Sequence, residues 1–106
     1  SKMENGVTFS FSEKTLTAHL SGEIDHHSAK PVREAVDSEL FKTRPEVLVL
    51  DFSRVKFMDS SGIGLIIGRA EVCASLLTQV RLSGVNPTLK KLMKLSGIEK
   101  IKNISI

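Results

Sequence analysis

The feature that most constrains this fold is an apolar, strand-like run that passes through a short polar segment into an amphipathic helix. Residues 47–52 (Val-Leu-Val-Leu-Asp-Phe) are almost continuously apolar, the pattern of a strand buried on both faces. Apolar side chains then recur at helical spacing, which predicts a helix over residues 61–77. The expected buried stripe of that helix consists of Ile63, Ile66, Ile67, Ala70, Ala74 and Leu77. A buried strand followed at once by a helix is typical of an α/β domain.

Before this strand, the sequence predicts a hairpin and a first helix. Residues 7–12 and 16–21 carry apolar side chains on either side of a polar connection, so we expect antiparallel strands, and Gly22 ends the second one. Ser28 can cap the helix that follows. Its expected inward-facing residues are Ala29, Val32, Val36 and Leu40. Residues 43–45 (Thr-Arg-Pro) stop this helix, because proline cannot continue it.

After the second helix, a short alternating strand is predicted over residues 79–83. Asn86 and Pro87 are a cap and a first-turn proline for a third helix. Gly97 stands where a left-handed residue often ends a helix. Residues 101–106 are expected to close the domain as an edge strand.

The predicted order of elements is therefore β-β-α-β-α-β-α-β. Right-handed crossovers make the later strands parallel and lay the helices against the sheet. A chain of 106 residues supports one hydrophobic core, and its composition, 41% apolar and 25% charged, is ordinary for a globular protein. We expect residues 1–106 to form a single α/β domain with a mixed, mostly parallel sheet and helices packed against it.

Charge and composition argue against nucleic-acid and membrane partners. The net charge is only +3, and with five Phe and no Trp or Tyr, platforms for stacking unpaired bases are scarce. The basic residues near the end of the sequence are interpreted as a solvated surface; they are Lys90, Lys91, Lys94, Lys100 and Lys102. No apolar run approaches the length of about 18 residues that spans a bilayer, and no signal-peptide pattern is present. Together with Cys73, a lone cysteine expected to be buried and inert, these features predict a cytoplasmic protein.

The glycines after the central strand resemble part of a dinucleotide-binding loop. Gly62, Gly64 and Gly68 follow a strand, but the third glycine comes one position late, and the acidic residue expected about 20 positions further on is missing. Close packing of the helix on the sheet explains these glycines instead.

Ser60 or Ser61 could in principle act as a nucleophile with His26 or His27 as the base. The Gly-x-Ser-x-Gly elbow of serine hydrolases is absent, and no third group is evident to orient the base. The paired histidines also lack the Cys, His or carboxylate partners of a zinc site. We therefore expect no catalytic residue, no metal and no cofactor, with a small serine hydrolase as the weaker alternative.

The junction between the central strand and the second helix suits recognition by a partner. Asp59 or Ser60 can cap the helix, and Gly62 and Gly64 keep its first turn free of bulky side chains. Residues 22–27 leave the second strand at an end where they could lie beside Ser60. We predict a polar surface here, with carboxylates and imidazoles near the hydroxyl groups.

Two segments carry a resemblance to a known family: residues 22–27 (Gly-Glu-Ile-Asp-His-His) and residues 57–64 (Phe-Met-Asp-Ser-Ser-Gly-Ile-Gly). Residues 68–69 (Gly-Arg) and 95–98 (Leu-Ser-Gly-Ile) agree with it, so the similarity spans almost the whole chain. On these residues the chain resembles the anti-sigma factor antagonists of the STAS domain family, most closely the sporulation-type antagonists of the anti-sigma-F factor. It departs from the family at residues 77–78 (Leu-Thr), where a glycine pair is common, so this turn must close without glycine.

The resemblance implies a STAS-like fold and a regulatory protein without catalysis of its own. Unphosphorylated antagonists of this family bind an anti-sigma factor that is also a serine kinase, and the sigma factor is released. The kinase phosphorylates the first serine of the Asp-Ser-Ser-Gly segment, here Ser60, which ends productive binding until a serine phosphatase restores it. The partner-binding residues expected on this basis are Glu23, Asp25, His26, His27, Asp59, Ser61 and Gly62.

Other signalling functions of such a domain remain open at this point. It could be a general-stress-type antagonist that uses the same switch, a sensor subunit, or the regulatory part of a transporter. A transporter would normally place the domain after a long apolar region, which this sequence does not contain. We expect a monomer and leave a dimer open.

Overall fold

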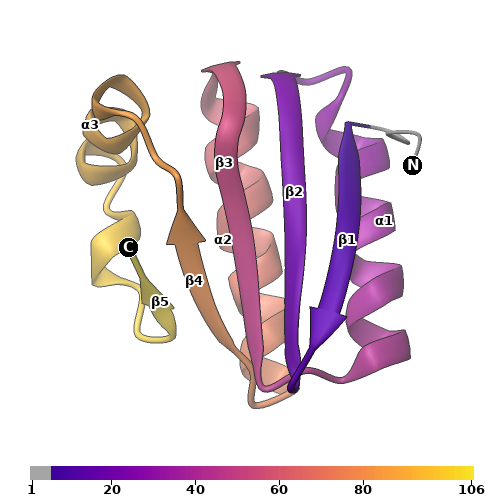
Figure 1. Cartoon of the computed structure of the whole chain (residues 1–106). Helices are drawn as coiled ribbons and strands as arrows, with labels where there is room; N and C mark the ends of the chain where they lie inside the picture. The colour runs from indigo at the N-terminus through magenta and orange to yellow at the C-terminus, as the bar shows by residue number, and fades with distance from the viewer. Residues whose placement is uncertain (1–5) are drawn as a thin grey trace.

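The computed structural model describes residues 6–106, which form a five-stranded sheet with the strands in chain order, β1-β2-β3-β4-β5 (Figure 1). The first residues of the predicted domain, 1–5, lie outside the described part. The elements are β1 (Val7–Ser12), β2 (Thr15–Ile24), α1 (Ala29–Thr43), β3 (Val47–Met58), α2 (Ser60–Ser75), β4 (Gln79–Ser83), α3 (Pro87–Leu95), a short 3-10 helix (Ile98–Lys100) and β5 (Ile104–Ser105).

The directions of the strands confirm the predicted mixed, mostly parallel sheet. β1 pairs with β2 in antiparallel fashion, and the pairs β2–β3, β3–β4 and β4–β5 are parallel. The hairpin between β1 and β2 turns through Glu13 and Lys14, both with positive φ (51° and 64°). Two such residues in a row make the tight turn whose twist matches a β-hairpin.

The sheet is covered unequally on its two faces. In Figure 1, α1 and α2 lie behind the same face, and the face toward the viewer carries no helix from the described residues. Leu48, Leu50 and Phe52 of β3 point to the covered face and are buried, whereas Val47 and Val49, which alternate with them, are only half-buried. The prediction that this strand is buried on both faces is therefore wrong, because one face of the sheet is left open.

Two strands run further than the sequence predicts, and one is shorter. β2 continues through Gly22 to Ile24, and β3 continues past Phe52 to Met58, because the two extensions pair with each other across two register shifts, at each of which β3 has one residue more than β2. The segment before Ser60 is thus strand and not loop. At the other end, the strand predicted over 101–106 shrinks to Ile104–Ser105.

The helices match their predicted positions more closely than the strands do. Cys73 is buried within the apolar stripe of α2, whereas Ala74 is exposed and Leu77 lies beyond the end of the helix, so these two were wrongly assigned to the stripe. α3 begins as predicted, with the Asn86 side chain accepting a hydrogen bond from Leu89 N–H (2.9 Å). Gly97 has the expected left-handed conformation (φ 78°).

The turn after α2 closes without glycine by placing Leu77 in the left-handed region (φ 60°). Leu77 N–H donates to the Ala74 carbonyl (3.2 Å), and Thr78 N–H donates to the Cys73 carbonyl (2.8 Å). This is the hydrogen-bond pattern with which many helices end on a glycine. The turn is fixed further because the buried Thr78 hydroxyl donates to the Pro45 carbonyl (2.7 Å).

Replacing Leu77 with glycine is expected to stabilise the protein. A left-handed conformation costs a non-glycine residue about 1–2 kcal/mol, and the Leu77 side chain is 89% exposed, so little burial is lost with it. Part of the gain is offset by the greater freedom of glycine in the unfolded chain. We expect Leu77→Gly to raise the free energy of unfolding by about 0.5–1 kcal/mol, measured by urea denaturation.

Leu95 provides the matched control, because it is also an exposed leucine (78%) but is the last residue of α3 and has no positive φ. Leu95→Gly should destabilise the protein by about 0.5 kcal/mol, since a position at the helix end realises only part of the cost of glycine in a helix interior, about 1 kcal/mol. If both variants shifted stability in the same direction, the backbone argument for Leu77 would be wrong.

Candidate functional site

The two polar segments singled out in the sequence lie side by side at one end of the sheet. In the pairing of β2 with β3, Glu23 is opposite Phe57 and Ile24 is opposite Met58. Beyond the last pair, Asp59 N–H donates to the Ile24 carbonyl (3.2 Å). The parallel strands therefore deliver both segments to the same edge, as expected.

Asp59, and not Ser60, caps α2. Its Oδ1 atom accepts a hydrogen bond from Ser61 N–H (2.8 Å), and its carbonyl accepts one from Gly62 N–H (3.0 Å). Ser60 is the first helical residue and is exposed, while Ser61 is half-buried. Because the cap is already supplied by its neighbour, the Ser60 hydroxyl is available to other molecules.

Asp25 organises the neighbouring segment. Its Oδ1 atom accepts hydrogen bonds from Ser28 N–H (3.1 Å) and His27 N–H (2.8 Å), and these bonds hold the pKa of Asp25 below its ordinary value. In return, Ser28 Oγ accepts from Asp25 N–H (3.0 Å) and donates to the Glu23 carbonyl (2.8 Å). Ser28 occupies the N-cap position of α1, as predicted, but makes no side-chain cap bond, and its hydroxyl stabilises the turn at residues 23–25 instead.

The two histidines lie on the exposed surface beside this turn. Their rings contact each other with centroids 4.0 Å apart, and His27 Nδ1 is 3.9 Å from Asp25 Oδ1. In the described part of the chain, no hydrogen bond connects either ring with Ser60 or Ser61. The arrangement offers imidazole groups to a partner but does not assemble a nucleophile with its base.

Gly62 and Gly64 have opposite surroundings, although the sequence treats them alike. Gly62 is buried, and a Cβ atom added there would overlap the Cγ and Sδ atoms of Met58. Gly64 is exposed, and a Cβ added there would have no neighbour within 4 Å. The expectation that Gly62 lets a partner approach the backbone therefore fails, since Gly62 serves the packing of α2 on β3, and Gly64 is the open position.

Phe57 is a surface residue that the sequence analysis passed over. It is 52% exposed and is paired in register with the exposed Glu23, next to the start of α2. The exposure of Phe57 follows from the burial pattern of β3, but only once the strand is known to extend to Met58. In that pattern, buried Val55 and Met58 lie on either side of exposed Lys56 and Phe57. Aromatic residues, Phe included, are enriched in the cores of protein–protein interfaces, which makes Phe57 a candidate contact residue.

A second polar cluster, also unforeseen, lies on the open face of the sheet. His19 Nδ1 donates to Asp51 Oδ2 (2.9 Å), and Ser10 Oγ lies 3.2 Å from His19 Nε2. The order serine, histidine, aspartate is that of a hydrolase triad. The pocket beside His19 is lined by Thr8, His19, Asp51, Ser53 and Arg54 and does not include Ser10. A molecule bound there would not face the serine, so we assign this cluster to sheet stability.

Asp51 should make the free energy of unfolding depend on pH in the acidic range. Burial raises its pKa, but the hydrogen bonds from His19 and from Ser53 N–H outweigh burial and lower the pKa overall. A carboxyl group with a lowered pKa stabilises the fold above its unfolded pKa of about 3.9 and loses this contribution as pH falls through the folded pKa. We expect the urea midpoint of the wild type to fall more steeply below about pH 4 than that of Asp51→Asn.

Glu46→Gln is the control, because it removes an exposed carboxylate, and its urea midpoint should fall with pH as steeply as that of the wild type. Equal slopes for the wild type and Asp51→Asn would contradict the assignment.

The described residues thus form a one-sided α/β sheet with an exposed serine at the start of α2. Within residues 6–106, no three His, Cys, Asp or Glu residues gather where they could hold a metal ion. None of the helices in this part of the chain has the length and apolarity needed to span a bilayer. The chain belongs to the STAS domain family, whose model matches residues 7–105.

Relatives of known function and of known structure agree with the family. The chain is 37% identical to the anti-sigma F factor antagonist of Paenibacillus polymyxa over 89 residues, which cover 84% of this chain and 76% of the relative. It is 28% identical to the anti-sigma-B factor antagonist of Listeria monocytogenes, covering 80% of this chain and 76% of the relative. Among solved structures, it is similar to the anti-sigma factor antagonist SpoIIAA in its unphosphorylated form, with a TM-score of 0.79, 27% identity, and coverage of 94% of this chain and 88% of the other. SpoIIAA is also known in a phosphorylated form, which this chain matches with a TM-score of 0.71.

Proposed function

We propose that this protein is an anti-sigma factor antagonist whose unphosphorylated form binds an anti-sigma factor serine kinase and thereby releases a sigma factor. The similarity to anti-sigma F factor antagonists supports this function. In this proposal the protein is a regulator and not an enzyme, and phosphorylation of Ser60 switches it off until a serine phosphatase removes the phosphate.

The observation that carries the proposal is the exposed Ser60 hydroxyl on the first turn of α2, in a helix that Asp59 already caps. Phosphorylation there adds about −1.5 to −2 charges close to the positive end of the helix dipole. The modified protein should therefore remain folded. The similarity to SpoIIAA, a protein known in phosphorylated and unphosphorylated forms, supports the idea that the fold tolerates such a change.

The proposed contact surface surrounds Ser60. It consists of Glu23, Asp25, His26, His27, Phe57, Asp59, Ser61 and Gly64, where Gly64 replaces the buried Gly62 of the original expectation. The carboxylates of Glu23, Asp25 and Asp59 give this surface negative charge. A phosphate placed among them would add repulsion and bulk at the point of contact, which accounts for loss of binding without any change of fold.

The test is phosphorylation of the purified chain by candidate anti-sigma kinases with ATP, followed by mass-spectrometric mapping of the phosphosite. We expect one phosphate, on Ser60, and none on the Ser60→Ala variant. A label on half-buried Ser61, or on exposed Thr88 at the start of α3, would refute the assignment. Turnover of ester substrates by the unmodified chain, lost in Ser60→Ala, would instead support the hydrolase alternative.

A general-stress-type antagonist is the second candidate, supported by the similarity to anti-sigma-B factor antagonists. Both functions would use the same switch at Ser60 and differ in the kinase that is bound. Parallel binding measurements with an anti-sigma-F and an anti-sigma-B kinase distinguish them, and we expect the tighter complex with the anti-sigma-F type.

Phe57 should contribute to kinase binding. Truncating an exposed aromatic residue within an interface commonly costs about 1 kcal/mol or more, so we expect Phe57→Ala to weaken binding about fivefold. Phe41 is the matched control, because its exposed fraction (53%) is almost the same as that of Phe57 (52%). It lies near the C-terminal end of α1, whereas the proposed contact surface adjoins the N-terminal end of α1. Calorimetric titration should give Phe41→Ala wild-type affinity, and equal losses in the two variants would exclude Phe57 from the contact surface.

A further inference from the structure

The charge of this chain is unevenly distributed along its sequence. Residues 86–106 contain five lysines and one acidic residue, Glu99, a net charge of +4, whereas the whole chain carries +3 and the remainder therefore −1. The interpretation of these lysines as a solvated surface explains their exposure but not their concentration in one segment. The five residues, named here the lysine surface, are Lys90, Lys91, Lys94, Lys100 and Lys102.

The fold places the lysine surface on one side of the molecule. Figure 1 shows α3, the short 3-10 helix and β5 together on the side of the sheet away from β1. The five lysines are exposed, and α3 turns Leu89 and Met93 into the core, so helical spacing directs its three lysines to the opposite side. Within residues 6–106 none of the five forms an ion pair. Their positive charge is therefore not neutralised by the protein itself.

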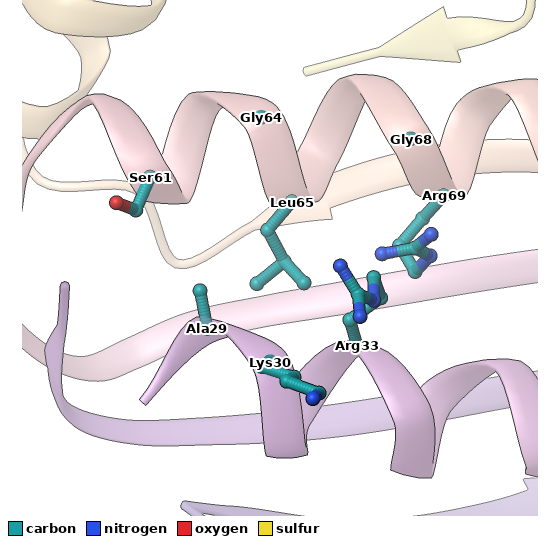
Figure 2. A pocket seen from close by; sticks show the side chains of 8 residues that line it. All are labelled: Ala29, Lys30, Arg33, Ser61, Gly64, Leu65, Gly68 and Arg69. Carbon is teal, nitrogen blue, oxygen red and sulfur yellow. The ribbon is translucent and has the colours of Figure 1, made fainter. Parts of the chain in front are cut away.

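The groove between α1 and α2 has a different electrostatic character. Figure 2 shows Lys30 and Arg33 on its α1 side, but α1 as a whole is balanced, with three basic residues (Lys30, Arg33, Lys42) and three acidic ones (Glu34, Asp37, Glu39). On the α2 side, a Cβ atom added at Gly64 or Gly68 would have no neighbour within 4 Å. Close packing of α2 on the sheet, the explanation first given for these glycines, therefore holds only for Gly62.

The composition of the lysine surface distinguishes between anionic partners. Residues 86–106 contain no arginine and no aromatic residue. Nucleic-acid recognition relies on arginine and on aromatic stacking, and the cores of protein interfaces are enriched in both and depleted in lysine. Anionic lipid headgroups attract lysine as a point charge, and clusters of about 4–8 basic residues on a helix are typical of such binding. Among anionic partners, a lipid surface therefore fits best.

Leu95 adds an exposed apolar side chain to this surface. It is 78% exposed, follows Lys94 directly and lies one helical turn after Lys91. An aliphatic side chain among lysines can enter the boundary between headgroups and acyl chains while the ammonium groups stay at the level of the headgroups.

We propose that the lysine surface binds reversibly to lipid membranes that carry anionic headgroups. The lysines contact the headgroups, and Leu95 inserts beside them. Each lysine close to such a membrane strengthens binding by about fivefold. The residues of the contact surface proposed around Ser60 are not involved, so this inference and the proposed function can fail independently.

The test is sedimentation of the full chain with vesicles made of equal parts phosphatidylcholine and phosphatidylserine, and with vesicles of phosphatidylcholine alone. We expect saturable binding to the mixed vesicles only. Raising sodium chloride from about 0.1 M to about 1 M, which shortens the Debye length from about 10 Å to about 3 Å, should abolish it. Absence of binding, equal binding to both kinds of vesicle, or tighter binding to a single-stranded DNA oligonucleotide than to mixed vesicles would overturn the proposal.

Two triple variants separate the lysine surface from net charge alone. The combined replacement of the three lysines of α3 should weaken binding to mixed vesicles at least about tenfold; its changes are Lys90→Gln, Lys91→Gln and Lys94→Gln. The control removes the same charge from exposed lysines elsewhere and should stay within about twofold of the wild type; its changes are Lys30→Gln, Lys42→Gln and Lys56→Gln. Circular dichroism verifies that both are folded, and equal losses would overturn the proposal.

Leu95→Ala tests the insertion and should weaken binding about threefold, because apolar area that enters the membrane is lost. Leu77→Ala is the matched control, since Leu77 is 89% exposed but lies outside the lysine surface, and it should bind as the wild type does. Wild-type binding of Leu95→Ala would overturn the insertion of Leu95.

Discussion

Gly62→Val should destabilise the protein by at least about 2 kcal/mol, because the new side chain would have to displace Met58 from the covered face of the sheet. Gly62 is buried, and Met58 is 4% exposed, so neither side has free space in which to relax. Valine forms helices slightly better than glycine, but this preference recovers only a few tenths of a kcal/mol. The loss is a large fraction of the roughly 5–15 kcal/mol that holds a small domain folded.

Two comparisons isolate the cause of this loss. Gly64→Val, two positions away on the same helix, adds the same side chain where nothing lies within 4 Å, so it should leave stability unchanged or slightly higher. Met58→Ala should reduce the cost of Gly62→Val, because it removes the atoms with which the valine collides. Urea denaturation of the four single and double variants measures both effects. If Gly62→Val retained wild-type stability and lost only partner binding, Gly62 would be a contact residue after all.

The order and direction of the strands could be predicted from the sequence, whereas their lengths could not. Strands that alternate with helices, joined by right-handed crossovers, leave few arrangements, and the parallel pairing of β2, β3, β4 and β5 follows. Residues 53–58 look like a loop because Ser53 and Arg54 break the apolar run. They form strand because residues 21–24 of β2 supply pairing partners, and such contacts between distant segments leave no local pattern.

The position of the candidate site could be predicted in the same way, but the structural roles of its individual residues could not. The end of the sheet at which the parallel strands β2 and β3 stop brings Glu23 opposite Phe57, three residues before Ser60, whatever the side-chain details. Whether Gly62 faces a partner or Met58 depends on how α2 is rotated over β3, which packing of the whole helix decides. Ser28 occupies the N-cap position of α1 without a side-chain cap bond, because its hydroxyl donates to the Glu23 carbonyl at the end of the extended β2.

Arg69 shows that a signal present in the sequence can still be passed over. It lies three residues after Ile66 and four before Cys73, both buried, so helical spacing already turns it inward. A charged residue on a buried stripe requires a partner or a ligand. The stripe was interpreted from its apolar members alone, and the ion pair with Asp37 on α1 therefore became evident only in the structure.

Ser60→Asp is expected to bind the cognate kinase at least tenfold more weakly than Ser60→Ala, a difference of about 1.4 kcal/mol. Ser60 is exposed at the start of α2, directly after Asp59, and Glu23 is paired with Phe57 at the same end of the sheet, so a further negative charge adds to an already acidic surface. In the proposed complex, the kinase would hold the phosphates of its nucleotide across the interface, and these would repel the new charge. The variant should remain folded, because a carboxylate at a helix start is favourable to the helix dipole.

Ser60→Asp should reduce kinase binding less than phosphorylation of Ser60 does, if negative charge is what reduces the affinity. Aspartate carries about half the charge of a phosphate and lacks its tetrahedral oxygens. Calorimetric titration of both variants against the nucleotide-bound kinase measures the difference, and Ser75→Asp, at the exposed far end of α2, controls for charge placed elsewhere on the helix. Raising the salt concentration should recover only part of the lost affinity, since charges buried in an interface are poorly screened. Equal affinities of Ser60→Asp and Ser60→Ala would show that the switch acts through the shape of the phosphate and not through its charge.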